Sequence, residues 1–282
     1  MIKEATVNEI LKWIEIHLEE RIDVENVVKF SGYSRRHIYT IFKAYTGMPI
    51  GKYIRQRKLC RAAYKLKLTS LSLAQIACSL EFDSQQSFSR SFKKLFGINP
   101  KAYRDNEAWD MSHLQAPFVI EAVTAPKVDI CHLTQKTFYG FEKKTCEHYL
   151  DAIQGINVSS RWDSIMKKIN RTECDLFFMT GFHPSKECAE KLEITTFCGT
   201  DIEKNKTRLM TKQRFEPEGV YAHFSYKGEW NEYFEVSERV YREILPKMKL
   251  KRRDSEDMEV IKGFDINNRF LISCDHYIPV MF

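Results

Sequence analysis

The stretch DSQQSFSRSFKKLFG, residues 83–97, places hydrogen-bonding and cationic side chains at helical spacing. The polar positions Gln86, Ser89, Arg90 and Lys93 fall at i, i+3, i+4 and i+7, on one face of a helix. Glutamine and arginine offer paired groups to base edges, serine reaches bases or phosphates, and lysine contacts phosphates. No acid shares this face, where it would repel a phosphate backbone. The pattern therefore indicates a surface that contacts double-stranded DNA.

The same arrangement occurs fifty residues earlier, because residues 33–55 align with residues 82–104. The matched pairs are Ile38 and Phe88, Phe42 and Phe92, Lys43 and Lys93, Gly47 and Gly97, and Tyr53 and Tyr103. A short helical segment and a turn precede each copy, so the sequence predicts a helix-turn-helix that is present twice. The ten predicted DNA contacts are Arg35, Arg36, Tyr39, Thr40, Lys43, Gln85, Gln86, Ser89, Arg90 and Lys93.

Further helices must position the two helix-turn-helix copies. Apolar periodicity predicts a leading helix over residues 6–20 and one amphipathic helix over residues 50–68, with basic side chains around its polar side. The predicted N-caps are Asp23, Ser34, Ser72 with Gln75, and Ser84 or Asp83. The result is an all-α double helix-turn-helix domain over residues 1–106.

The charge of the chain is unevenly distributed. The formal net charge is +6, yet residues 28–104 hold 16 basic side chains against only Glu81 and Asp83. Clustered positive charge of this kind is typical of a polyanion partner. We therefore expect DNA as the partner, and no membrane, because no exposed apolar helix accompanies the charge.

Residues 7–104 resemble the DNA-binding domain of the AraC/XylS family, through LxxxAxxxxFxSxxxFxRxFKKxFGxxPxxYR in the second copy. The segments IGKYIRQRKL and FDSQQSFSRSFKK are similar to its MarA, SoxS and Rob branch. The resemblance implies a monomer whose two recognition helices enter successive major-groove segments, and it implies contact with RNA polymerase. It also implies that Gln85, Gln86, Ser89 and Arg90 contact the promoter-proximal half of the site.

The first copy departs from that branch. Its close members carry a tryptophan, a glutamine and an arginine where this chain has Arg36, Tyr39 and Thr40. Tyrosine and threonine do not reproduce an arginine that reads guanine, although Arg36 replaces part of that function. We therefore expect a partly different half-site for the helix over residues 35–45.

The second half of the chain has a strand pattern. After a predicted linker at 107–126, strands are expected at 128–133, 138–146, 176–182, 193–199, 219–228, 257–264 and 269–280, with helices at 159–170 and 231–245. This order contains βαββ twice, so we expect an α+β domain over residues 127–282, with an antiparallel sheet and two helices on one face. FSYKGEWNEYFEVSERVYREIL, MEVIKGF and DHYIPV resemble the GyrI-like ligand-binding domain.

That resemblance implies a cleft for small amphipathic or cationic molecules, with an acid facing it four residues before a proline. The matching acid is Asp275, before Pro279. Aromatic faces and one carboxylate suit a lipophilic cation. The candidate aromatic residues are Tyr139, Phe141, Trp162, Tyr226, Trp230 and Tyr277. For each of them the alternative is an ordinary core or surface position.

Other chemistry has little support in the sequence. The eight cysteines contain no C-x-x-C pair, and neither G-x-S-x-G nor H-E-x-x-H occurs. Cys274 and His276 share a strand face, but chance explains that pair. We expect no catalytic residue, metal or cofactor. No apolar run approaches the roughly 20 residues that span a bilayer, and no secretory signal is recognisable.

The sequence thus predicts a cytoplasmic, nucleoid-associated bacterial regulator that activates stress, efflux or multidrug-resistance genes. Two alternatives stay open. The second domain is an interaction and stability module of a ligand-independent activator, or it is an enzyme fused to a DNA-binding domain.

Overall fold

The structure, a computed structural model, describes residues 2–115, 117–118, 124, 126–166, 175–201, 210–216, 218–262 and 271–282. The chain forms two compact units. The helical unit comprises Met1–Lys67, Leu71–Asn106 and His113–Ala122, and the sheet unit comprises Leu68–Ser70, Glu107–Ser112 and Val123–Phe282. The ends of the predicted helix 159–170, of strands 257–264 and 269–280, and part of linker 107–126 lie outside the described residues.

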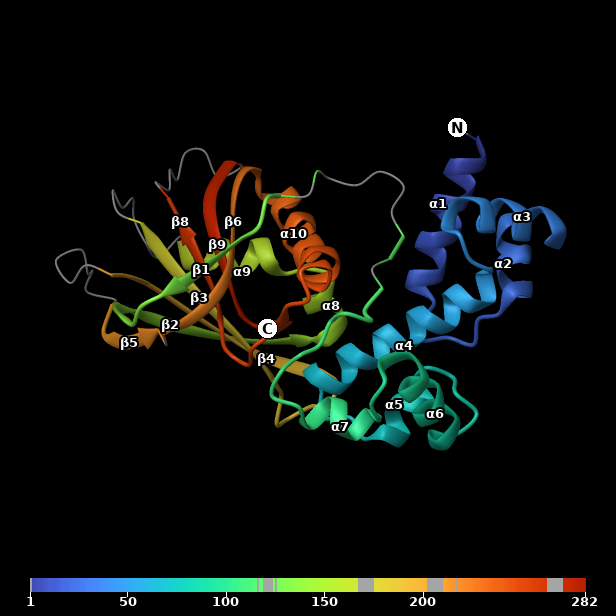
Figure 1. Ribbon diagram of the computed structural model, residues 1–282, viewed down its shortest axis with the longest axis horizontal. Coiled ribbons are helices and arrows are strands. Elements are labelled where there is room, and N and C mark those ends of the chain that lie inside the picture. Colours follow the sequence, from blue (N-terminus) through green and yellow to red (C-terminus); the bar gives the residue numbers. More distant parts are fainter. Residues whose placement is uncertain are drawn as a thin grey trace. The chain divides into compact units, whose positions relative to one another are not determined.

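The helical unit contains the predicted repeat (Figure 1). Its helices are α1 (Ile2–Ile16), α2 (Val24–Ser31), α3 (Arg35–Thr46), α4 (Ile50–Leu68), α5 (Leu73–Ser79), α6 (Gln85–Phe96) and α7 (Pro100–Asp105). The pairs α2–α3 and α5–α6 are the two helix-turn-helix copies. The leading helix begins and ends earlier than the predicted range 6–20.

The capping residues explain where these helices begin and end. Asp23 and Ser72 each form a capping box, with Asn26 and Gln75 respectively. Ser34 and Ser84 accept hydrogen bonds from the first turns of α3 and α6, so Ser84 rather than Asp83 is the cap. Both helices end at a glycine, Gly47 (φ 73°) or Gly97 (φ 77°), in the left-handed region that favours glycine.

The sheet unit is built on one antiparallel sheet. Its strands are β1 (Asp129–Leu133), β2 (Lys136–His148), β3 (Leu176–Pro184), β4 (Lys191–Thr200), β5 (Lys212–Glu216), β6 (Gly219–Glu229), β7 (Lys251–Arg252), β8 (Asp257–Ile261) and β9 (Leu271–Met281). The order is β1-β6-β9-β8-β3-β4-β2-β5, and β7 pairs with β9. Its helices are α8 (Tyr149–Ile153), α9 (Val158–Met166) and α10 (Trp230–Arg239), followed by a π-helical segment Val240–Ile244 and α11 (Leu245–Lys247).

The double βαββ prediction is confirmed by this topology. One repeat is β2-α9-β3-β4 and the other is β6-α10-β8-β9, and their inner strands β3 and β8 pair at the centre of the sheet. The short strands β1 and β5 were not part of the predicted repeat. Each precedes one repeat in the chain but pairs with the first strand of the other, β1 with β6 and β5 with β2. This exchange adds one strand to each end of the sheet.

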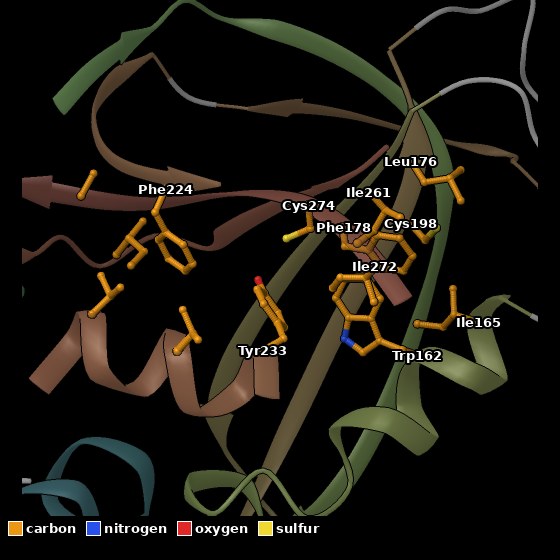
Figure 2. Packing of buried hydrophobic residues seen from close by; sticks show 14 of the residues in the cluster. Trp162, Ile165, Leu176, Phe178, Cys198, Phe224, Tyr233, Ile261, Ile272 and Cys274 are labelled. Atoms are coloured by element: carbon orange, nitrogen blue, oxygen red, sulfur yellow. The ribbon is translucent and has the colours of Figure 1, made fainter. Parts of the chain in front are cut away.

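One face of the sheet packs against the helices (Figure 1). Trp162 and Ile165 of α9 and Tyr233 of α10 lie against a core that includes Phe178 and Phe224 of the sheet, as Figure 2 shows. A second cluster occupies the opposite face, with buried Phe138, Phe177, Met179, Phe197, Met258 and Val260. The sheet therefore separates two apolar regions, and strand alternation decides which side chains enter each one.

Residues of the predicted linker make ordered contacts. Within the sheet unit, the backbone of Trp109 exchanges hydrogen bonds with Arg252 of β7, at 2.9 and 3.2 Å. Within the helical unit, Gln115 accepts a hydrogen bond from Arg57, and the Phe118 amide donates to the Tyr53 hydroxyl at 3.2 Å. These segments thus extend both units beyond their predicted boundaries.

Candidate nucleic-acid interface and effector site

The two recognition-type helices are anchored by one apolar face each. Phe88, Phe92 and Phe96 of α6 are buried. The Phe92 ring stacks on Phe96 and meets the rings of Phe88 and Tyr103 edge-on. In α3 the buried residues Ile38, Ile41 and Phe42 form the corresponding apolar face. Since an apolar stripe fixes the rotation of a helix, the polar positions between these residues must face outward.

The α6 face is polar and accessible. Gln85, Gln86, Arg90 and Lys93 are exposed, and Ser89 is half-buried. Within the described residues, none of these five side chains forms a hydrogen bond or ion pair. Two cations and two amides without intramolecular partners keep their hydrogen-bonding capacity for another molecule. The predicted residues of the second copy are therefore brought together on one open face.

The α3 face differs, because several of its predicted residues contact one another. Arg35 forms an ion pair with Glu25 of α2 at 2.7 Å. Its hydrogen bond to Tyr39 and the charge of Glu25 raise the pKa of Arg35. Tyr39 is half-buried against the core of the first copy, and the Thr40 hydroxyl donates to the Arg36 carbonyl at 2.9 Å. Arg35, Arg36 and Lys43 are exposed, and within the described residues Arg36 and Lys43 form no ion pair.

The basic residues of α4 do not form the exposed polar side that the sequence predicted. Arg57, Lys58, Arg61 and Lys65 are all buried, with exposed fractions of 4%, 8%, 6% and 0%. The predicted helix over residues 50–68 is confirmed, and Arg55 is exposed as expected, but the prediction was wrong for these four charges, which are not available to a polyanion. Glu15 and Glu19, which lie before the stretch 28–104 with its two acids, form ion pairs with Arg57, Arg61 and Lys65, whereas Lys58 donates to the Glu20 carbonyl at 3.0 Å.

Glu15 is the centre of this buried ion-pair system. Its carboxylate accepts hydrogen bonds from Arg57 Nε at 2.6 Å and Nη2 at 2.9 Å, a bidentate pair. Burial lowers the pKa of Arg57, but the Glu15 charge and hydrogen bonds outweigh this, so the pKa is raised overall. Burial and the same carboxylate raise the pKa of Tyr53.

In the sheet unit, the predicted carboxylate and most of the predicted aromatic residues lie on opposite faces. Alternation along β9 places Asp275 and Tyr277 on one face, and Cys274 and His276 on the other. Tyr277 packs against the Phe138 cluster. Phe141, Trp162, Tyr226 and Trp230 pack against the helix-side core, and Tyr139 alternates onto the same side as Phe141.

Asp275 is already compensated by its neighbours. It accepts hydrogen bonds from the Ser225 hydroxyl at 2.5 Å and meets His223 Nε2 at 3.1 Å, and it forms an ion pair with Lys262. Burial raises the pKa of Asp275, but the contacts to Lys262, Ser225 and His223 outweigh this and lower the pKa overall. A carboxylate with three such partners has little need of a cationic ligand.

The carboxylate on the aromatic side is Glu259 of β8, which sequence reasoning missed. The Tyr233 hydroxyl donates to Glu259 at 2.6 Å, and Tyr233 stacks on Trp230 with ring centroids 5.7 Å apart. Trp230 in turn meets Trp162 edge-on at 4.6 Å. Burial raises the pKa of Glu259. Within the described residues, Glu259 forms no ion pair.

His276 and Asp257 lie next to the Tyr233–Glu259 pair. The Tyr233 hydroxyl also meets His276 Nδ1 at 2.9 Å. Asp257 forms an ion pair with Arg252 at 3.1 Å. Burial raises the pKa of Asp257, but Arg252 and His276 together outweigh this and lower the pKa overall. Only the β8–β9 register, which pairs Glu259 with His276, reveals these contacts, and the sequence carried no local signal for that register.

The structure offers no nucleophile at Cys274. Burial raises the pKa of this thiol, which keeps it protonated and unreactive at neutral pH. Among the residues that the structure describes, no three His, Cys, Asp or Glu side chains are grouped to hold a metal ion. Nor does any described helix have the length and apolarity needed to cross a bilayer.

Comparison with known proteins matches both units. Residues 27–106 match a family described as "Helix-turn-helix domain", and residues 129–280 match "Integron-associated effector binding protein". The protein YkgA of Escherichia coli (strain K12) is 36% identical over 203 residues, 72% of this chain and 85% of the relative.

Two relatives match along nearly the whole chain. The F1 operon positive regulatory protein of Yersinia pestis is 32% identical over 288 residues, covering 99% of this chain and 89% of the relative. The right origin-binding protein of Escherichia coli (strain K12) is 29% identical over 264 residues, covering 92% and 91%. The chain therefore belongs to the AraC/XylS family of transcriptional regulators and joins an AraC-type DNA-binding domain to an effector-binding domain.

Proposed function

We propose that the protein is a sequence-specific transcriptional activator that binds promoter DNA as a monomer through α3 and α6. The observation that carries this proposal is the open face of α6, where amides and cations stand without intramolecular partners. The repeat supplies a second recognition helix in the same chain, so a single molecule carries both α3 and α6. The Yersinia pestis relative, named a positive regulatory protein, supports activation rather than repression.

The two readers contribute unequally in this proposal. On α6, Gln85, Gln86 and Arg90 are available for base edges. On α3, Tyr39 and Thr40 use part of their hydrogen-bonding capacity within the helix, so Arg36 is the main base-reading candidate and Lys43 contacts phosphate. Selection of bound sites from random DNA tests the proposal. The selected motif should have two half-sites, and the half-site contacted by α6 should show the stronger sequence preference.

We further propose that the sheet unit binds a lipophilic cation beside Glu259. Its support is a carboxylate with burial-raised pKa and no ion pair in the described chain, hydrogen-bonded to Tyr233, which stacks on Trp230. Aromatic faces attract cations, and a cation would compensate the buried negative charge. Trp230 and Tyr226 are half-buried and so border solvent. The asymmetry between Glu259 and the well-compensated Asp275 favours Glu259 as the partner of the ligand.

Thermal unfolding with tetraphenylphosphonium, a lipophilic cation, tests this effector proposal. A bound ligand stabilises the fold by about 2.7 kcal/mol at a hundredfold excess over its Kd, so Tm should rise with concentration. Glu259→Gln should abolish the shift, because the amide keeps the shape and loses the charge. Asp275→Asn is the matched control and should retain the shift.

The remaining outcomes distinguish the alternatives. If Asp275→Asn abolishes the shift and Glu259→Gln retains it, the acid predicted from the sequence is the ligand partner. If no cation shifts the unmodified protein, the sheet unit is an interaction module instead.

The raised pKa of Glu259 gives a pH dependence with a defined sign. A folded-state pKa above the unfolded value contributes stability at low pH, and this contribution is lost as pH rises through the folded pKa. In the unliganded protein, Glu259→Gln should therefore remove this loss and raise Tm more at pH 8 than at pH 5. Equal changes in Tm at both pH values would show that Glu259 ionises normally.

A further inference from the structure

Lys65 of α4 contacts Ser79 in the second helix-turn-helix copy and Glu19 in the segment that precedes the first copy. Its side chain is fully buried, and its ammonium lies 2.8 Å from the Glu19 carboxylate and 2.8 Å from the Ser79 hydroxyl. Glu19 follows α1, which packs on α2 and α3 of the first copy. Ser79 is the last residue of α5, the helix that precedes the second reader. One buried cation thus joins the halves of the helical unit.

The chemistry of this contact favours a fixed geometry. A buried ammonium loses its hydration, so it requires acceptors at hydrogen-bond distance. If α5 moved relative to α4, the ammonium would lose the hydrogen bond to Ser79. The Ser79 hydroxyl itself donates to the Ile76 carbonyl at 3.1 Å, which orients its oxygen toward Lys65.

A second hydrogen bond supports the same arrangement. Arg55 of α4 donates from Nη2 to the hydroxyl of Ser91 in α6 at 2.8 Å. This pair is exposed, so by itself it constrains α6 weakly. Together the two contacts hold α4 to both helices of the second copy, whereas Arg57 holds α4 to Glu15 of α1.

We propose that the Lys65–Ser79 contact makes Lys65 a positioning residue, which fixes α6 relative to α3 and thereby sets the spacing between the two DNA half-sites. This inference rests on the proposed function, in which both helices enter the major groove. Adding one base pair between half-sites moves them apart by about 3.4 Å and rotates them by about 35°. A rigid pair of readers cannot follow that change, whereas a loosened pair can.

The repeat supplies a matched control for Ser79. Ser31 ends α2 as Ser79 ends α5, and its hydroxyl donates to the Val28 carbonyl at the same 3.1 Å. Within the described residues the Ser31 hydroxyl makes no hydrogen bond to α4. Ser79→Ala and Ser31→Ala therefore remove the same local bond. Ser31→Ala also removes a bond from the Tyr33 amide at 3.4 Å, but only Ser79→Ala removes the contact with Lys65.

The test measures the affinity of the full chain for DNA with the selected half-site spacing and with one base pair inserted or removed. The spacing penalty is the Kd for DNA with an altered spacing divided by the Kd for DNA with the selected spacing. For Ser79→Ala we expect this penalty to fall about tenfold, the factor for one hydrogen bond to a charged group. Lys65→Met should give an equal or larger fall, and Ser31→Ala should leave the penalty unchanged.

Each outcome decides between separate claims. If the unmodified protein shows a spacing penalty that Ser79→Ala and Lys65→Met both retain while folded, this inference is overturned and the proposed function stands. If the unmodified protein shows no spacing penalty, or no specific binding, the two-reader proposal itself fails. If Ser31→Ala lowers the penalty as much as Ser79→Ala does, a general loosening of the fold explains the effect.

Discussion

Arg57→Met is expected to lower the free energy of unfolding of the helical unit by about 3–5 kcal/mol, the cost of breaking a buried ion pair by removing one partner. Arg57 is 4% exposed and forms a bidentate contact with Glu15. Its loss leaves that carboxylate with weaker compensation, from Tyr53 at 3.4 Å and Arg61 at 3.6 Å. Urea denaturation followed by circular dichroism at a helical wavelength measures the change.

Lys12→Met is the control for this prediction. Lys12 pairs with Glu9 at 3.2 Å, but both side chains are more than 60% exposed. An exposed pair contributes about 0.2–1 kcal/mol, so its removal should change stability little. If Arg57→Met destabilises the unit no more than Lys12→Met does, the buried charges of α4 do not hold the fold together.

Arg90→Ala is expected to weaken binding to the specific site by about 1–3 kcal/mol and to relax discrimination at one base pair. Arg90 is exposed and has no intramolecular partner in the described chain, so its removal should leave folding intact. Competition titrations against a set of single-base variants of the selected site measure both effects.

The contrast with Lys43→Ala separates base reading from phosphate contact. Lys43 is exposed near the end of α3, where a lysine reaches the backbone. Its removal should weaken all DNA sequences alike and reduce the slope of log Kd against log salt by about 1. If both substitutions leave the affinity unchanged at moderate salt, these helices are not the DNA contacts.

Much of the architecture could be predicted from the sequence because it depends on local patterns. The Ser34 and Ser84 caps, the glycines that end α3 and α6, and the fifty-residue offset are all visible in the chain itself. The double βαββ order followed from alternating apolar strands. Strand β1 was predicted at 128–133, whereas β5 was not predicted. The pairing partners of both strands were not predicted, because each strand pairs with the repeat that it does not precede.

The charge prediction failed because it depended on partners distant in sequence. Periodicity shows which α4 positions share a face, but Glu15 lies 42 residues before Arg57 and turns a basic face into an interior one. The positive charge available to DNA is therefore smaller than the sequence count suggested. In the proposed function, the residues on α3 and α6 must therefore supply more of the DNA contact.

The prediction of the effector site also failed because it depended on partners distant in sequence, here within a sheet. Alternation along β9 correctly separates Asp275 from Cys274, but it does not reveal which face the helices cover. Once α9 and α10 occupy the face of Cys274, Asp275 lies on the face away from Trp162 and Trp230. Glu259 of the neighbouring strand lies on the helix side, where it accepts a hydrogen bond from Tyr233. The strand register, rather than the motif, identifies that carboxylate.

Selection of bound fragments from a random DNA pool, with the full chain at moderate salt, tests the central claim most directly. The account predicts an enriched motif of two half-sites about one helical turn apart, with fixed spacing. In a parallel selection, Arg90→Ala should lose information at one position of one half only. A pool without any enriched motif, or a motif unchanged by Arg90→Ala, would contradict the claim that α3 and α6 read DNA.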